Sequence, residues 1–201
     1  MSDQTVNQDD DLSAFTEDIA GQIRAYVAAV AEVARGDSPD SAVSVLLLEV
    51  SQLLLAGGRL GAIADVIPHE QYEPDAGYEP DADTLREDLA ALLAPIDEYA
   101  EVFDPYADEP EVIRSRLSDD LADVALDLIH GLTHYSEGRL NEALWWWQFS
   151  YLSNWGATGS AALRALQSVV AHVRLDARID DETAAEQRLL AQVAAEATGA
   201  E

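Results

Sequence analysis

The stretch that decides the fold runs from Leu117 to Trp155 and reads LSDDLADVALDLIHGLTHYSEGRLNEALWWWQFSYLSNW. Apolar residues recur at steps of three and four on both sides of Gly138, as on the buried face of an α-helix. Glycine is typical just past the end of a helix. The stretch therefore predicts two helices folded back on each other through the turn Glu137-Gly138-Arg139.

The first helix of this pair carries a possible metal site on the face opposite its apolar stripe. His130 and His134 are one turn apart there, and Asp127 lies three residues before His130. Paired imidazoles with a carboxylate can bind zinc, iron or manganese. Glu49, a lone acid in a strongly apolar predicted helix, is the candidate for the further ligand such a site needs. The alternative is an acidic helix face that is simply solvated.

The second helix of the pair is apolar on two nearly opposite sides, which is typical of a helix packed between others. We therefore expect it to be central in the fold. Trp146 belongs to neither apolar side and shares its own side with Arg139, Glu142 and Ser153. Since tryptophan and arginine are enriched where proteins bind each other, this edge is a candidate partner-binding site. The alternative is that a neighbouring helix or the C-terminal tail covers Trp146.

The pair also looks like one tetratricopeptide-type hairpin. Gly131, Tyr135, Gly138, Ala143 and Trp147 fall at about the small, aromatic, glycine, alanine and aromatic positions of that repeat. A weaker match to the same repeat pattern lies about a hundred residues earlier, and no third copy is visible. Fewer than three repeats do not make a stable solenoid, so a repeat-like helical bundle is the prediction.

Composition limits the classes of function. There is no Cys, which excludes disulfides, thiolate catalysis and Cys-ligated zinc. The formal net charge is −28, and all 11 basic residues are Arg. Direct binding to nucleic acid or to an anionic membrane is disfavoured, because phosphate contact needs a basic patch. The acidity is equally consistent with a salt-tolerant or GC-rich source and with a protein that mimics nucleic acid.

The remaining chain divides into a helical domain with two tails. We expect residues 1–11 to be disordered and acidic, residues 12–177 to form the domain, and residues 178–201 to form a weakly amphipathic helical tail. Within the domain, residues 69–83 read as an acidic, proline-containing loop with a duplicated Tyr-Glu-Pro-Asp-Ala. A short helix is expected over residues 85–93, and residues 96–103 are expected to continue as helix. The N-terminus is unlike a signal peptide, which predicts a cytoplasmic protein.

Five segments of the chain resemble a known family of bacterial proteins, the domain of unknown function 5063 family: LLLEVSQLLLAGGRLGA, FDPY, SDDLADV, EALWWWQFSYLSNWG and LRALQS. The resemblance covers about Asp11 to Leu175, and the three consecutive tryptophans are its most specific part. It implies a cytosolic protein of high-GC bacteria. It also implies genes often found near a recombination mediator, which points toward genome maintenance. It supplies no activity and no catalytic residues.

These observations predict an all-α single bundle of about six or seven helices built on antiparallel hairpins. The leading functional prediction is a non-enzymatic cytosolic adaptor or regulator that binds a protein partner, without a cofactor. The first alternative is a metal-binding bundle, enzyme or sensor, that uses His130, His134, Asp127 and Glu49 with a divalent transition metal. The second is an acidic nucleic-acid mimic that acts through the 69–83 loop. The sequence predicts no oligomeric state.

Overall fold

A computed structural model describes residues 2–69 and 82–175 of the chain. The chain divides into two compact units, residues 1–166 and 167–201, and the fold below is that of the first. The predicted tail 178–201 and most of the predicted acidic loop lie outside the described residues.

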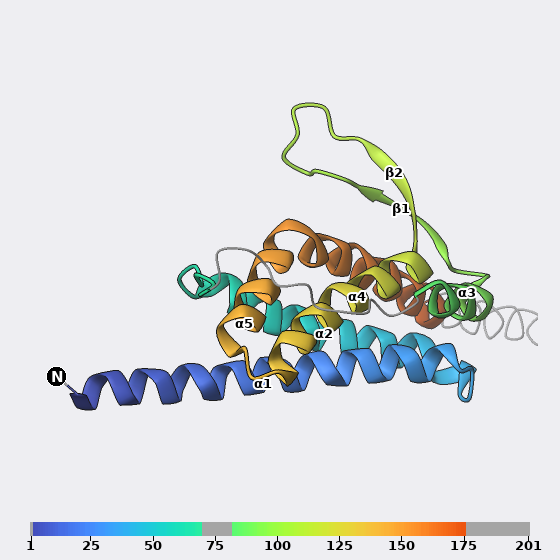
Figure 1. Ribbon diagram of the computed structural model, residues 1–201. Helices are drawn as coiled ribbons and strands as arrows, with labels where there is room; N and C mark the ends of the chain where they lie inside the picture. The colour runs from blue at the N-terminus through green and yellow to red at the C-terminus, as the bar shows by residue number, and fades with distance from the viewer. Residues whose placement is uncertain (1, 70–81, 176–201) are drawn as a thin grey trace, which may run out of the picture. The chain divides into compact units, whose positions relative to one another are not determined.

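The first two helices form an antiparallel pair (Figure 1). Helix α1 spans Ser2–Ala34 and helix α2 spans Ala42–Ala62, after a single 3₁₀ turn, Pro39–Ser41. Gly36 makes the connection at a φ of 74°, a value that glycine adopts without strain. The expected disordered segment 2–11 is part of α1. Residues 2–20 contain neither Gly nor Pro, so nothing in the backbone chemistry stops the helix.

The predicted central pair is present, with its turn at the expected place and a π-helical segment where α-helix was expected to continue to Trp155. Helix α4 spans Leu117–Ser136, helix α5 spans Leu140–Ser150, and Gly138 turns the chain between them at a φ of 77°. After α5 the helix widens into a π-helical segment, Tyr151–Trp155, and continues as α-helix over residues 156–175.

A β-hairpin corrects the prediction for residues 96–103. Helix α3, Ala82–Leu93, ends close to its expected boundary, but strands β1, Glu98–Val102, and β2, Val112–Arg116, follow it. They pair antiparallel, with Glu98 opposite Arg116 and Val102 opposite Val112. The description all-α is thus coarsely correct: the described fold is mostly helical, with one small two-stranded sheet.

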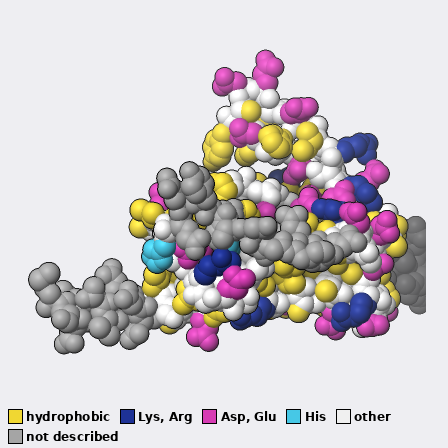
Figure 2. Space-filling model, in the orientation of Figure 1, with side chains coloured by type: hydrophobic (Ala, Val, Ile, Leu, Met, Phe, Trp, Pro, Cys, Tyr) yellow, Lys and Arg dark blue, Asp and Glu magenta, His cyan; other side chains and the backbone are white. Residues whose placement is uncertain are grey.

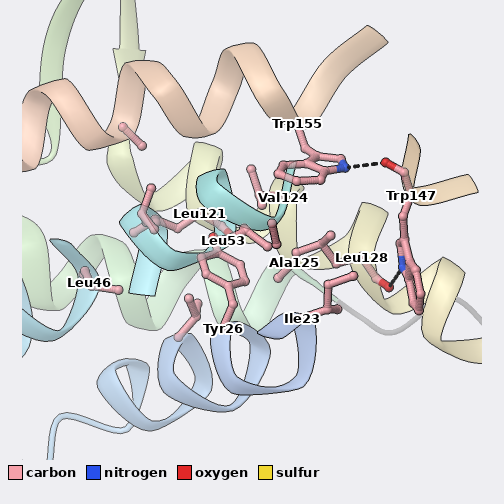
Figure 3. Close-up of a cluster of buried hydrophobic side chains, with 14 of the residues drawn as sticks. Ile23, Tyr26, Leu46, Leu53, Leu121, Val124, Ala125, Leu128, Trp147 and Trp155 are labelled. Atoms are coloured by element: carbon pink, nitrogen blue, oxygen red, sulfur yellow. Dashed lines mark hydrogen bonds between the residues drawn. The ribbon is translucent and has the colours of Figure 1, made fainter. Parts of the chain in front are cut away.

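The centre of the core lies among α1, α2, α4 and α5, and α3 adds Leu89 and Leu93 to it. Figure 3 shows the side chains that converge there from these helices. Tyr26 is buried and its hydroxyl donates a hydrogen bond to the Leu121 carbonyl at 3.0 Å, which satisfies its polar atom. The Trp147 indole donates to the Leu128 carbonyl at 3.1 Å. Helices α4 and α5 approach closely because Gly131 lies against the Trp147 ring, where no side chain would fit.

One described segment, Pro39–Ala62, is long and apolar enough to cross a membrane by length and composition. One such helix is weak evidence for a membrane span, since the core helix of a soluble protein meets the same criteria of length and composition. In the structure the segment supplies buried side chains to the core, among them Leu46, Val50, Leu53 and Leu60.

Candidate protein-binding surfaces

The two histidines of the predicted metal site are close together on α4. His134 is completely buried, and its ring lies 5.3 Å from that of His130, edge to face. The half-buried His130 packs against Trp146 of α5, with 4.1 Å between ring centres. The two imidazoles therefore lie side by side, one inside the protein and one at its edge.

The carboxylates predicted to complete the metal site do not join these imidazoles as a ligand set. Asp127 accepts a hydrogen bond at 2.6 Å from the Asn154 side-chain amide. Partial burial raises the pKa of Asp127, and the Asn154 hydrogen bond and nearby His130 oppose that shift. Glu49 is half-buried on α2. Within residues 2–69 and 82–175, no group of three or more His, Asp or Glu residues converges so as to hold a metal ion.

Trp146 is partly covered by α4, which is the predicted alternative to an exposed anchor. It is half-buried, and its indole N–H donates to the Asp127 carbonyl at 2.8 Å, which ties α5 to α4. Of its predicted companions, Arg139 forms an ion pair with Glu137. Ser153 is exposed, and its hydroxyl donates to the Phe149 carbonyl at 2.8 Å. Trp146, Arg139 and Ser153 are thus each bonded to another residue of the chain, so this edge differs from a docking site built around an exposed tryptophan.

Glu142, the fourth residue predicted for that edge, is only 5% exposed. An extended segment, residues 63–69, covers it, and the His69 amide donates to the Glu142 carboxylate at 2.9 Å. Gln148, two turns further along α5, accepts from the Val66 amide at 2.7 Å and donates to the Leu60 carbonyl at 2.9 Å. The chain itself thus contacts both Glu142 and Gln148 in this structure, and binding of a partner by Glu142 stays a prediction.

A buried carboxylate anchors the hairpin to the helices. Asp97, 4% exposed, immediately precedes β1 and accepts hydrogen bonds from the amide and the hydroxyl of Ser118, at 2.8 and 3.0 Å. It also accepts from the Arg116 guanidinium at 3.0 Å. The Asp97 carboxylate therefore binds one free amide in the first turn of α4 and closes the base of the hairpin at the same time.

A second contact links the inner face of the hairpin to α4. The Tyr99 hydroxyl donates to the Asp120 carboxylate at 2.6 Å. Burial raises the pKa of Asp120 to about 6, and the nearby carboxylates of Glu101, Asp123 and Asp119 act in the same direction. Burial and the contact with Asp120 also raise the pKa of Tyr99. The pair is therefore a partly desolvated hydrogen bond whose carboxylate titrates unusually close to neutral pH.

The far end of the hairpin exposes apolar side chains. We call residues 102–112 the hairpin tip. Val102 is 45% exposed, Val112 67%, Phe103 74% and Tyr106 95%. Figure 2 shows hydrophobic side chains gathered along the underside of the hairpin in that view and acidic ones around its far end. Sequence reasoning missed this surface, although the alternation in VIRSR and the prolines Pro105 and Pro110 were signals for a strand and a turn.

Comparison with known proteins supports the fold and the family. The crystal structure of protein BF1032 from Bacteroides fragilis is similar to this chain with a TM-score of 0.62 and 22% sequence identity. The match covers 75% of this chain and 89% of that one. No curated protein matches the chain. The family model described as Domain of unknown function (DUF5063) matches residues 10–172. The chain therefore belongs to the DUF5063 family.

Proposed function

We propose that this protein is a non-enzymatic adaptor or regulator that binds a protein partner through the hairpin tip. The observation that carries the proposal is the exposure of Val102, Phe103, Tyr106 and Val112 on one projecting hairpin. A single exposed apolar residue is ordinary, but a group of them that includes aromatic side chains marks an interaction site.

Hydrogen bonds within the hairpin tip, which fix its conformation, support the same function. The Asp104 carboxylate accepts from the Tyr106 amide at 2.9 Å, and the Asp104 carbonyl accepts from the Ala107 amide at 3.3 Å. The loop that carries Tyr106 is thus held in a defined turn by its own hydrogen bonds. Less conformational entropy is lost on binding when a loop is already ordered, so the aromatic side chains are presented at a low cost.

The other functional predictions stand as alternatives with less support. Arg139 and Ser153 extend the binding surface only if a partner also reaches the α4–α5 edge. The tetratricopeptide-like interpretation of that hairpin is supported by the close fit of Gly131 against Trp147. A cytoplasmic location and a link to genome maintenance remain part of the proposal. Metal binding and nucleic-acid mimicry have no supporting geometry in the described residues, and most of the acidic loop lies outside them.

Site-specific photocrosslinking tests the proposal. Phe103 is replaced by a photoreactive phenylalanine analogue, and cells of the source organism that express the variant are irradiated. We expect a discrete covalent adduct with another protein at this position. The matched control carries the same analogue at Leu48, which is 56% exposed on α2, away from the hairpin. Adducts of equal yield at both positions, or none at position 103, would contradict a role for the tip.

A further inference from the structure

The hydrogen bonds at both ends of the hairpin ladder establish which backbone groups face outward. The Phe103 amide donates to the Glu111 carbonyl at 3.1 Å, and the Leu117 amide donates to the Asp97 carbonyl at 2.9 Å. In an antiparallel pair, residues that exchange these bonds alternate with residues whose N–H and C=O point away from the partner strand. The backbone groups on the outer edge of β1 are therefore those of Glu98, Ala100 and Val102.

Among the described residues the sheet has two strands, so the outer edge of β1 has no further strand beside it. Tyr99 of β1 binds Asp120 of α4 from one face of the ribbon. The side chains of Glu98, Ala100 and Val102 are exposed on the other face. An exposed strand edge is a template on which another extended chain can add as a further strand.

The charges on the two strands are opposite in sign. Strand β1, EYAEV, carries two glutamates and no basic residue, whereas β2, VIRSR, carries two arginines and no acid. Pairing of β1 with β1 of a second copy would bring glutamates together, which is destabilising between neighbouring strands. Two copies of a chain with a net charge of −28 also repel each other as a whole. Glu98 pairs with Arg114 of β2 at 3.4 Å, and Glu101 accepts from the Ser115 hydroxyl at 2.7 Å. The two glutamates therefore disfavour self-pairing, and an added basic strand would share their carboxylates with β2.

We infer that β1 recognises its partner by strand addition, and that the added strand is a basic and apolar segment of another protein. Glu98 lies on the exposed face of the ribbon and Glu101 on the other, because successive side chains alternate. A matching strand carries basic residues three positions apart, with an apolar residue between them opposite Ala100. This inference rests on the proposed function, because the same partner then continues over Phe103 and Tyr106.

The test uses the full-length, isotope-labelled protein and a seven-residue peptide with two arginines three positions apart, separated by threonine and valine. Hydrogen exchange of individual amides is measured by NMR. We expect the Ala100 and Val102 amides to exchange about fivefold more slowly with the peptide, since they become donors to it. The outward amides of β2, at Val112 and Arg114, should not change. A peptide with glutamates in place of the arginines should protect neither edge.

Two substitutions at one position provide matched variants. Ala100→Pro removes an outward N–H and no bond of the β1–β2 ladder, and proline is tolerated on strand edges. Ala100→Val keeps that N–H. We expect the peptide to lose its effect on Val102 in the proline variant and to keep it in the valine variant. Protection of the Phe103 amide, which bonds Glu111, reports that the hairpin is intact.

Other results separate the two proposals. Protection spread over acidic helix surfaces, alike in the proline and valine variants, would overturn strand addition and show only attraction by charge. If the photocrosslinked adduct at position 103 survives Ala100→Pro, strand addition is wrong and the tip proposal stands. If the proline variant unfolds the hairpin, the exchange measurement on the unsubstituted protein still tests the inference. Slower exchange of the Val112 and Arg114 amides, with no change at Ala100 and Val102, would overturn it.

Discussion

At the scale of single residues, two glycines in helices are expected to respond in opposite ways to the same substitution. A Cβ at Gly131 would lie 2.0 Å from Nε1 of the buried Trp147, and a Cβ at Gly58 would meet nothing within 4 Å. We expect Gly131→Ala to destabilise the fold by about 1–3 kcal/mol through overpacking. Gly58→Ala should stabilise it by up to about 1 kcal/mol through helix propensity. Thermal unfolding followed by circular dichroism measures both, and equal shifts would contradict the close packing of α4 on α5.

Asp120 is expected to make the free energy of unfolding depend on pH between about pH 4 and 6. Its pKa is raised to about 6 in the folded protein, so its stabilising contribution is complete below the unfolded value of about 3.8 and is lost as pH rises through 6. Asp120→Asn retains an acceptor for the Tyr99 hydroxyl and removes the charge. We expect the variant to melt about 2 °C higher than the native protein at pH 7.5 and to lose part of the slope between about pH 4 and 6.

The control for that experiment is Asp88→Asn, which removes one exposed carboxylate from α3. If both variants change the pH profile equally, net charge and not the Tyr99–Asp120 contact is responsible.

Single residues also show where sequence reasoning stops. The spacing of His130 and His134 correctly places them one turn apart, but it cannot say that His134 is completely buried. Glu142 and Trp146 share a side of α5 on a helical wheel, but different parts of the chain pack against them in the structure. Segment 63–69 covers Glu142, and α4 binds the Trp146 indole. The neighbours that bury these side chains come from distant parts of the chain.

At the scale of elements, Gln148 is expected to hold the extended segment 63–69 on α5. Its side chain accepts from the Val66 amide and donates to the carbonyls of Leu60 and Ala64, at 2.7, 2.9 and 3.3 Å. We expect Gln148→Ala to lower the free energy of unfolding by about 1–3 kcal/mol and to speed exchange of the Val66 amide. Gln148→Glu keeps the acceptor but not the donors, so Val66 should stay protected. Equal exchange at Val66 in both variants would rule out this role.

Helices were predictable and the strands were not, for a physical reason. The α4–α5 pair has a long apolar period and a glycine turn, both of which lie within one continuous stretch. In the hairpin, Tyr99 and Val102 are three residues apart, a spacing that also suits a helix. What makes them strand residues is pairing with Ser115 and Val112 across the tip. Segment 63–69 is less predictable still, because hydrogen bonds to α5 hold it and it has no repeating pattern of its own.

At the scale of the whole molecule, we expect stability to rise with salt. The sequence has 39 acidic and 11 basic residues, so the compact state brings like charges together. Raising NaCl from about 0.02 to about 0.5 M shortens the screening length to a few ångströms and weakens this repulsion. The melting temperature should increase and then level off, and KCl should give the same curve as NaCl. A flat or falling curve would mean that the stabilising ion pairs outweigh the repulsion.

The widened turn at Tyr151–Trp155 determines which side chains of the following helix face the core. Trp147, Tyr151, Trp155 and Gly159 recur every four residues, and in a regular α-helix each such step drifts by about 40°. A π turn takes about one residue more, which cancels the drift and keeps Trp147 and Trp155 both buried. Loss of one residue here would still give a continuous helix. The next turns would, however, be rotated by about 100°, so that Ala162 and Leu166, now buried, would leave the core. Insertions and deletions in this segment should therefore be tolerated less well than substitutions.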